Sequence, residues 1–146
     1  MDINAINTLI SKEFYKYKNV KTIKFGFYDE NTVGITLDGY VMWFIPNDLF
    51  IFDANKLSRG VAPLDVKCLV HTNGLENAVR TNELIKTEKG TLTIFKSEKV
   101  EVFVDTKLLK VFDKNSTYKI TKPYQPVLVY ENDILVGLVC PTRYER

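Results

Sequence analysis

The sequence VLVYENDILVGLV (residues 127–139) decides the predicted fold, because two apolar segments flank a short polar turn. The turn is Glu131-Asn132-Asp133, and the segments on both sides of it are rich in β-branched residues. Such a pattern is typical of two antiparallel strands that are joined by a tight connection. We therefore expect a β-hairpin close to the end of the sequence.

A helix and further strands are expected upstream of this hairpin. Asp105 stands at the N-cap position ahead of apolar residues that continue at helical spacing to Phe112, which indicates a short helix. Residues 83–99 are predicted to form another hairpin, with its turn at residues 88–90. The last third of the sequence thus combines one helix with antiparallel strands.

The first third of the sequence has a similar order of elements. Apolar residues between Ile3 and Tyr17 recur at steps of three and four, which indicates an amphipathic helix. Alternating residues then predict a strand over 23–27 and an antiparallel meander over 32–45, with a turn at Asp38-Gly39. A helix followed by strands therefore occurs at both ends of the sequence.

From this near-duplication we predict an α+β fold, in which two helix-plus-antiparallel-sheet half-repeats pack together. The half-repeats occupy about residues 1–52 and 83–143, and a connector of about residues 53–82 joins them. No Gly-rich or Ser-rich linker separates the two parts, so residues 1–146 are expected to form a single domain.

The composition is that of an ordinary soluble domain. The 146 residues carry a formal net charge of +2, and 45% of them are hydrophobic. No apolar run approaches the roughly 20 residues of a membrane-spanning helix, and the first residues lack the pattern of a signal peptide. We expect a cytoplasmic protein that has no membrane partner.

No residue pattern indicates catalysis, a metal site or a cofactor. Cys68, Cys140 and the single histidine, His71, are too scattered for the clustered spacing of zinc ligands. An enzyme hypothesis would use His71 or Asp38 as a base, yet no positioned nucleophile accompanies either residue. The Asp38-Gly39 pair is more typical of a turn. We therefore expect a non-enzymatic protein without metal or cofactor.

Both outer thirds of the sequence resemble a domain of the bacterial DNA sliding clamp, the ring-shaped processivity factor of replicative polymerases. Residues 37–42, Leu-Asp-Gly-Tyr-Val-Met, resemble the family's T-D-G-Y/H-R-L motif. Residues 102–112 are similar to the short strand and helix of the last clamp domain. Residues 125–127 and 138–143 are similar to its closing strands.

The resemblance implies that the helices of the domain face double-stranded DNA inside a ring. Lysines on the two predicted helices would then contact phosphates independently of base sequence, and these contacts would weaken as salt rises. The predicted DNA-facing residues are Lys12, Lys16, Lys107, Lys110 and Lys114.

The resemblance also implies a hydrophobic pocket for short peptides of polymerases and other replication proteins. One side corresponds to residues 37–42, and the other side comes from the closing strands of a neighbouring domain. The predicted pocket residues are Leu37, Gly39, Tyr40, Val41, Met42, Tyr124, Pro126, Leu138, Cys140, Pro141 and Arg143. Because the two sides lie at opposite ends of one domain, the pocket is expected to form by head-to-tail association of copies into a homo-oligomer.

These observations indicate two possible functions. The first is a non-enzymatic, sliding-clamp-like domain for DNA replication or processivity, which acts by self-association or by binding replication proteins. The alternative is a stand-alone protein-interaction or inhibitor module of a mobile element, which keeps the fold without encircling DNA. In that case aromatic residues such as Tyr40, Trp43 and Tyr124 would anchor a protein partner.

Overall fold

The structure is a computed structural model, which describes residues 1–16, 23–53 and 63–146, and of residues 14–16 only the backbone. The described part of the chain contains one α-helix, three short 3₁₀ helices and nine strands. Their order is α1 (Ile3–Lys16), β1 (Lys24–Asp29), β2 (Thr32–Thr36), β3 (Val41–Pro46), η1 (Asn47–Leu49), η2 (Val66–Leu69), β4 (Glu76–Thr87), β5 (Gly90–Lys96), β6 (Glu101–Asp105), η3 (Thr106–Leu109), β7 (Thr117–Ile120), β8 (Val127–Glu131) and β9 (Ile134–Val139).

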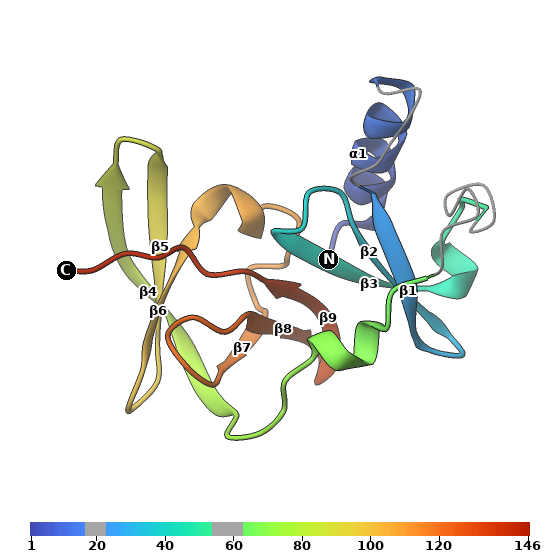
Figure 1. The fold of residues 1–146 in the computed structure, drawn as a ribbon. Coiled ribbons are helices and arrows are strands. Elements are labelled where there is room, and N and C mark those ends of the chain that lie inside the picture. The colour runs from blue at the N-terminus through green and yellow to red at the C-terminus, as the bar shows by residue number, and fades with distance from the viewer. Residues whose placement is uncertain (17–22, 54–62) are drawn as a thin grey trace.

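All nine strands are joined by antiparallel pairing, in the order β1-β2-β3-β9-β8-β7-β4-β5-β6 (Figure 1). The hairpin predicted over residues 127–139 is confirmed as β8 and β9. It lies inside the sheet, because β9 pairs with β3 and places Val139 opposite Val41. In the described part of the chain, the β3–β9 pair is the one strand pairing that joins the first third to the last third.

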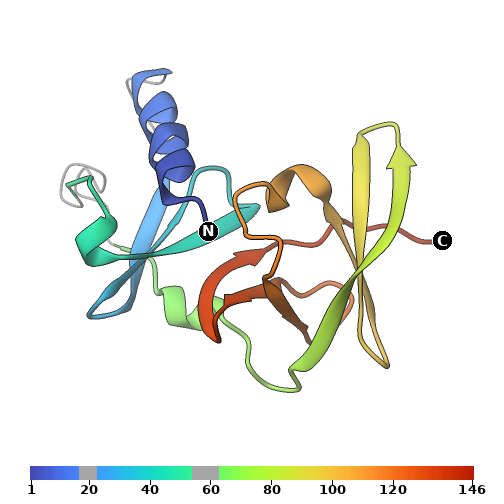
Figure 2. The same cartoon turned by 180° about the vertical axis from the view of Figure 1, so that it is seen from behind.

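β4 is shared between two parts of the sheet. Its first residues, Glu76–Ala78, pair with β7, whereas later residues up to Thr87 pair with β5. A register shift between Arg80 and Leu84 interrupts the pairing with β5. β4, β5 and β6 stand apart from β1, β2 and β3, with β7–β9 between them, as both views show (Figures 1 and 2). Because β4 runs from Glu76 to Thr87, the predicted end of the connector at residue 82 falls inside a strand.

The first predicted helix is confirmed as α1, a helix of 14 residues. Asp2 caps it, since its Oδ1 accepts a hydrogen bond from Ala5 N at 3.0 Å. Ile6 and Ile10, one turn apart, are fully buried in the same cluster as Trp43, and each isoleucine contributes about 1.5–3 kcal/mol by its burial. Among the described residues, no helix is both long and apolar enough to cross a membrane.

The predicted α+β fold with two helix-plus-sheet half-repeats is wrong. The second predicted helix is only the 3₁₀ turn η3, which covers four residues. Asp105 does cap it, accepting a hydrogen bond from Lys107 N at 3.0 Å, but a polar turn at residues 113–116 comes almost directly after it. The first turn of an α-helix is costly, so a segment this short gains too little from propagation to form one.

The strands of the two predicted modules also fail to form separate sheets. The side chains of β3 from Val41 to Ile45 are buried, and β9 supplies the backbone hydrogen bonds along one edge of this strand within the same chain. An unpaired strand edge is unfavourable, so pairing of the two edges is the simplest way to remove both. The result is one largely β structure with a single α-helix beside β1–β3 (Figure 1).

Other parts of the chain cover the two outer strands of the sheet. Beside β1, Leu64 N donates to Phe25 O at 2.8 Å, and a Cβ added to Gly26 would lie 2.1 Å from Leu64 O. Beside β6, Thr142 N donates to Phe103 O at 2.7 Å. Both segments therefore protect strand edges that would otherwise be free to pair with another chain.

Candidate functional site

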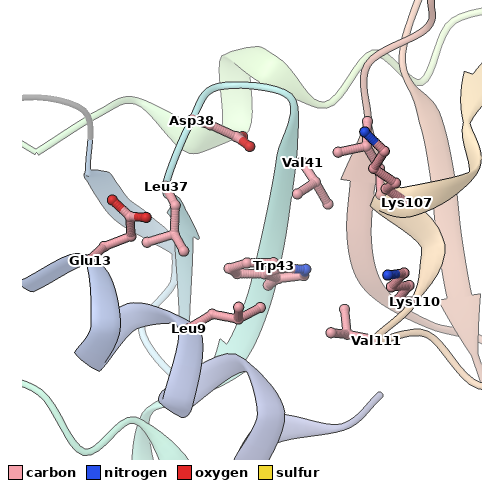
Figure 3. Close-up of a pocket in the computed structure, with 10 residues that line it drawn as sticks. Leu9, Glu13, Leu37, Asp38, Val41, Trp43, Lys107, Lys110 and Val111 are labelled. Atoms are coloured by element: carbon pink, nitrogen blue, oxygen red, sulfur yellow. The ribbon is translucent and has the colours of Figure 1, made fainter. Parts of the chain in front are cut away.

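A groove lies between α1, the turn from β2 to β3, and η3 (Figure 3). Its volume is about 530 Å³, which is within the usual range for a ligand pocket. We call it the Trp43 groove. It is lined by Leu9, Glu13, Leu37, Asp38, Val41, Trp43, Lys107, Leu108, Lys110 and Val111.

Trp43 lies at the centre of this groove and carries its most informative polar atom. Its side chain is only 4% exposed, and its buried Nε1 has no hydrogen-bond partner among the described residues. Figure 3 shows this nitrogen at the end of the ring that faces Lys110 and Val111 of the opposite wall. A buried donor without a partner costs about 1–3 kcal/mol, so an acceptor that entered the groove would recover this energy.

The other apolar side chains form the walls around the indole ring. Leu9 of α1 is 39% exposed although it lies next to the buried face of the helix. Leu37, Leu108 and Val111 are half-buried, and they pack against the main core. The groove therefore offers an apolar surface that solvent still reaches.

Charged residues of opposite sign stand on opposite sides of the groove. Lys107 and Lys110 belong to the η3 side, and Glu13 and Asp38 lie on the side of α1 and the β2–β3 turn (Figure 3). Neither lysine forms a salt bridge with a described residue. Their charges are therefore available to a ligand.

The β2–β3 turn holds Asp38 at the rim of the groove. Tyr40 N donates to Asp38 Oδ1 at 2.9 Å, and Gly39 N donates to Thr36 Oγ1 at 2.9 Å. Gly39 has a φ of 85°, which a residue with a side chain rarely adopts. Asp38 thus serves the turn in the way that the Asp-Gly pair indicates.

A second groove of about 510 Å³ borders η3, and four cationic side chains line it: Arg80, Lys107, Lys110 and Lys114. We call it the basic groove. Asp105 is the one acidic residue among its described lining residues, and its carboxylate already accepts the hydrogen bond from Lys107 N. Lys107 and Lys110 line both grooves, so the two sites share these side chains.

The predicted DNA-facing lysines are only partly brought together. Lys107, Lys110 and Lys114 line the basic groove. Lys12 lines a different hollow on α1, which also includes Ile51. The side chain of Lys16 lies outside the described residues. Contact of these lysines with DNA stays a prediction.

Residues 40–42 and 138–140, which belong to opposite halves of the predicted peptide pocket, lie side by side within one chain. Met42 is opposite Leu138 in the β3–β9 pair, and both side chains are buried. Cys140 N donates to Tyr40 O at 2.8 Å beyond the end of that pair. No second copy is therefore needed to bring the two segments together.

Only two of the predicted pocket residues, Leu37 and Val41, line the Trp43 groove. Tyr124 is 54% exposed elsewhere on the surface, and the Arg143 guanidinium lies 5.6 Å from the centre of its ring. The remaining predicted residues lie outside the groove: Gly39 and Tyr40 are exposed at the turn, and Pro126, Cys140 and Pro141 are half-buried. Burial, and to a lesser degree Asp38, raises the pKa of the Cys140 thiol.

Sequence reasoning did not assign Leu9, Glu13 or Arg80 to a site. Leu9 and Glu13 are one helical turn apart, and this spacing is the only signal that connects them in the sequence. Arg80 lies in the predicted connector, and only the pairing of β4 carries it to the basic groove. Each of these side chains reaches its groove through tertiary structure.

The described residues contain no group of three or more His, Cys, Asp or Glu side chains that could hold a metal ion. His71 is exposed in the segment before β4. Comparisons of the chain with protein-family models, curated proteins and solved structures found no match.

Proposed function

We propose that this protein is a non-enzymatic protein-interaction domain, which binds an apolar side chain of a partner in the Trp43 groove. The observation that carries this proposal is the buried Nε1 of Trp43, which has no partner among the described residues and faces the groove. A peptide carbonyl beside an apolar anchor is an acceptor that suits such a donor. The same ligand would therefore use both the indole nitrogen and the apolar walls.

The kind of residue in the groove supports binding to a protein. Trp43 is only 4% exposed, so it forms the floor of the groove, and the more exposed apolar walls around it are the surface that a partner would bury. Leu9, Leu37 and Val111 surround it with apolar surface, and burial of one large anchor side chain contributes about 1.5–3 kcal/mol. A groove of this volume accommodates one or two such side chains.

The chemistry of the lining favours binding over catalysis. The titratable groups in the Trp43 groove are Glu13, Asp38, Lys107 and Lys110. Among the described residues, the lining contains no Ser, Thr, Cys or His that such a group would activate as a nucleophile. Asp38 is engaged with the backbone of its own turn.

A replication partner remains a prediction that comes from the resemblance of residues 37–42 and 138–143 to the sliding clamp. Polymerase peptides with apolar anchors are one class of ligand that the groove would accept. An inhibitor or adaptor role in a mobile element uses the same groove and differs only in the partner.

The test uses the single tryptophan of the chain as a reporter of its own site. Capped peptides with a Leu-Phe anchor are titrated into the protein, and the fluorescence of Trp43 is recorded. We expect saturable changes in emission, because an anchor in the groove removes water from the apolar walls around the ring and supplies an acceptor for Nε1. An emission spectrum that stays unchanged up to millimolar peptide would contradict the proposal.

Leu9→Asp is the matched loss-of-binding variant, since Leu9 is partly exposed in the groove wall and its replacement leaves the buried core intact. Leu49→Asp is its control, because Leu49 is 47% exposed on η1 and lines none of the described grooves. Binding should be lost in the first variant and retained in the second. Equal binding by both variants would place the ligand elsewhere.

A further inference from the structure

We infer that the ligand of this domain is a peptide with an apolar anchor and acidic residues on one side of it. The anchor occupies the Trp43 groove, and the acidic residues extend over η3 into the basic groove. This inference rests on the proposed function, because it names the chemistry of the partner for the same site.

The two grooves share a wall. Lys107 and Lys110 line both of them, and η3, the element that carries Lys107, lies between α1 and the β4–β6 part of the sheet (Figure 2). A chain that leaves the Trp43 groove on the side of η3 therefore passes both lysines. Beyond them it meets Arg80 and Lys114.

Within the described part of the chain, no ion pair neutralises the cations of the basic groove. None of Arg80, Lys107, Lys110 and Lys114 forms a salt bridge with a described residue. The Asp105 carboxylate, which caps η3, is the one opposing charge among the described residues that line this groove. Three net positive charges thus surround one groove, and carboxylates of a ligand complement them.

The opposite side of the Trp43 groove explains why the acidic residues lie on one side of the anchor only. Glu13 and Asp38 stand there, and they repel carboxylates that would extend toward α1. A ligand that is acidic throughout would meet like charges on that side. The geometry therefore selects a polarised peptide, whose acidic part points toward η3.

A peptide fits these features better than a nucleic acid does. The Trp43 side chain is 4% exposed, so it presents no open ring face on which a base could stack. The two carboxylates beside it would also repel a phosphate backbone that continued through the Trp43 groove. An apolar side chain followed by carboxylates meets neither obstacle.

The experiment compares capped peptides that carry the Leu-Phe anchor with three glutamates or three glutamines on one side of it. Each peptide is made with the three residues before the anchor and with the three residues after it, because the charges do not fix which end of the bound peptide points toward η3. Trp43 fluorescence gives the dissociation constants. At about 50 mM salt we expect the better glutamate peptide to bind roughly tenfold more tightly than its glutamine counterpart, and at about 500 mM salt the difference should largely disappear.

Arg80→Gln and Lys114→Gln are the diagnostic variants, since both residues are exposed and line only the basic groove. Each should weaken the glutamate peptide a few-fold and leave the glutamine peptide unchanged. Lys122→Gln removes an exposed charge that lines none of the described grooves, and it should change neither affinity. Thermal melting of each variant checks that the fold is intact.

The possible results separate the two proposals. Equal affinity for glutamate and glutamine peptides would overturn this inference and leave the proposed function standing. Failure of every anchored peptide to bind would overturn both. Tighter binding of an oligothymidine than of the glutamate peptide, with the same loss in Arg80→Gln and Lys114→Gln, would also overturn the inference and assign the basic groove to nucleic acid.

Discussion

Trp43 of β3 lies directly opposite Gly137 of β9, and the ring of Phe112 occupies the space beside that glycine. Directly opposed residues of an antiparallel pair project from the same face of the sheet. The missing side chain at Gly137 therefore leaves room for Phe112 on the Trp43 face. Because Phe112 is close to η3 in the chain, this contact positions the lysine-bearing side of the groove relative to the indole ring.

Replacement of Gly137 with alanine should destabilise the protein. A Cβ at this position would lie 2.5 Å from Phe112 Cζ and 3.1 Å from Met42 O, so the ring or the backbone has to move. We expect Gly137→Ala to lower the free energy of unfolding by about 1–3 kcal/mol, as measured by urea denaturation. The double variant Gly137→Ala with Phe112→Leu provides more room, and the two changes should therefore cost less together than the sum of the single changes. Strict additivity would contradict the proposed contact.

Trp43→Phe should separate stability from binding. The variant loses some packing, which costs energy, but it also removes the buried N–H that has no partner among the described residues. These effects oppose each other, so we expect the free energy of unfolding to change by no more than about 1 kcal/mol. Peptide affinity, measured by isothermal titration calorimetry, should fall about tenfold because one hydrogen bond is lost. Unchanged affinity would mean that the indole nitrogen does not take part in binding.

The turn between β8 and β9 should become more stable when Asp133 is replaced by glycine. Asn132 and Asp133 have φ values of 51° and 62°, which is the left-handed region. Hairpins of two residues with such backbone angles strongly favour Asn-Gly. We expect Asp133→Gly to raise the free energy of unfolding by about 0.5–1 kcal/mol, and Asp133→Ala to lower it, in parallel urea titrations. A stabilising alanine would show that the turn adopts another conformation.

The ammonium group of Met1 should make stability depend on pH in the alkaline range. Burial lowers the pKa of this group, but hydrogen bonds to the carboxylates of Glu131 and Asp113 outweigh burial and raise the pKa above its ordinary value of 8.0. A raised pKa in the folded state means that the contribution is fully present below pH 8.0 and is lost as the pH rises through the folded-state pKa. Urea denaturation from neutral pH to pH 10 measures this loss.

An added Gly-Ser dipeptide before Met1 is the control for this pH dependence, since it replaces the ammonium with an amide at the same position. The extended protein should be less stable at neutral pH, and its stability should vary less above pH 8.0 than that of the parent. Parallel curves for the two proteins would rule out the Met1 ion pairs as the cause.

Much of the local structure was predictable from the sequence, and the candidate site was not. Helical spacing from Ile3 onward and the polar turn after Tyr130 predicted α1 and the β8–β9 hairpin, because both depend on contacts between residues that are near in sequence. Asp105 was correctly predicted as a cap. The segment that it caps was predicted to continue to Phe112 as a helix, but η3 ends at Leu109. The chain beyond Leu109 is held by tertiary contacts such as that of Phe112 with Gly137, which is distant in sequence.

Periodicity and turn chemistry act over a few residues, so the amino-acid order is enough to predict α1, the cap at Asp105 and the β8–β9 hairpin. The pairing of β3 with β9 depends on tertiary structure, because it joins Val41 to Val139, 98 positions apart in the sequence, and either strand edge has several chemically equivalent partners. That pairing places Trp43 between α1 and η3, with lysines across the groove from it and an indole nitrogen that no described residue pairs with. A binding site of this kind exists only after distant segments have met, and its residues carry no shared local signal in the sequence.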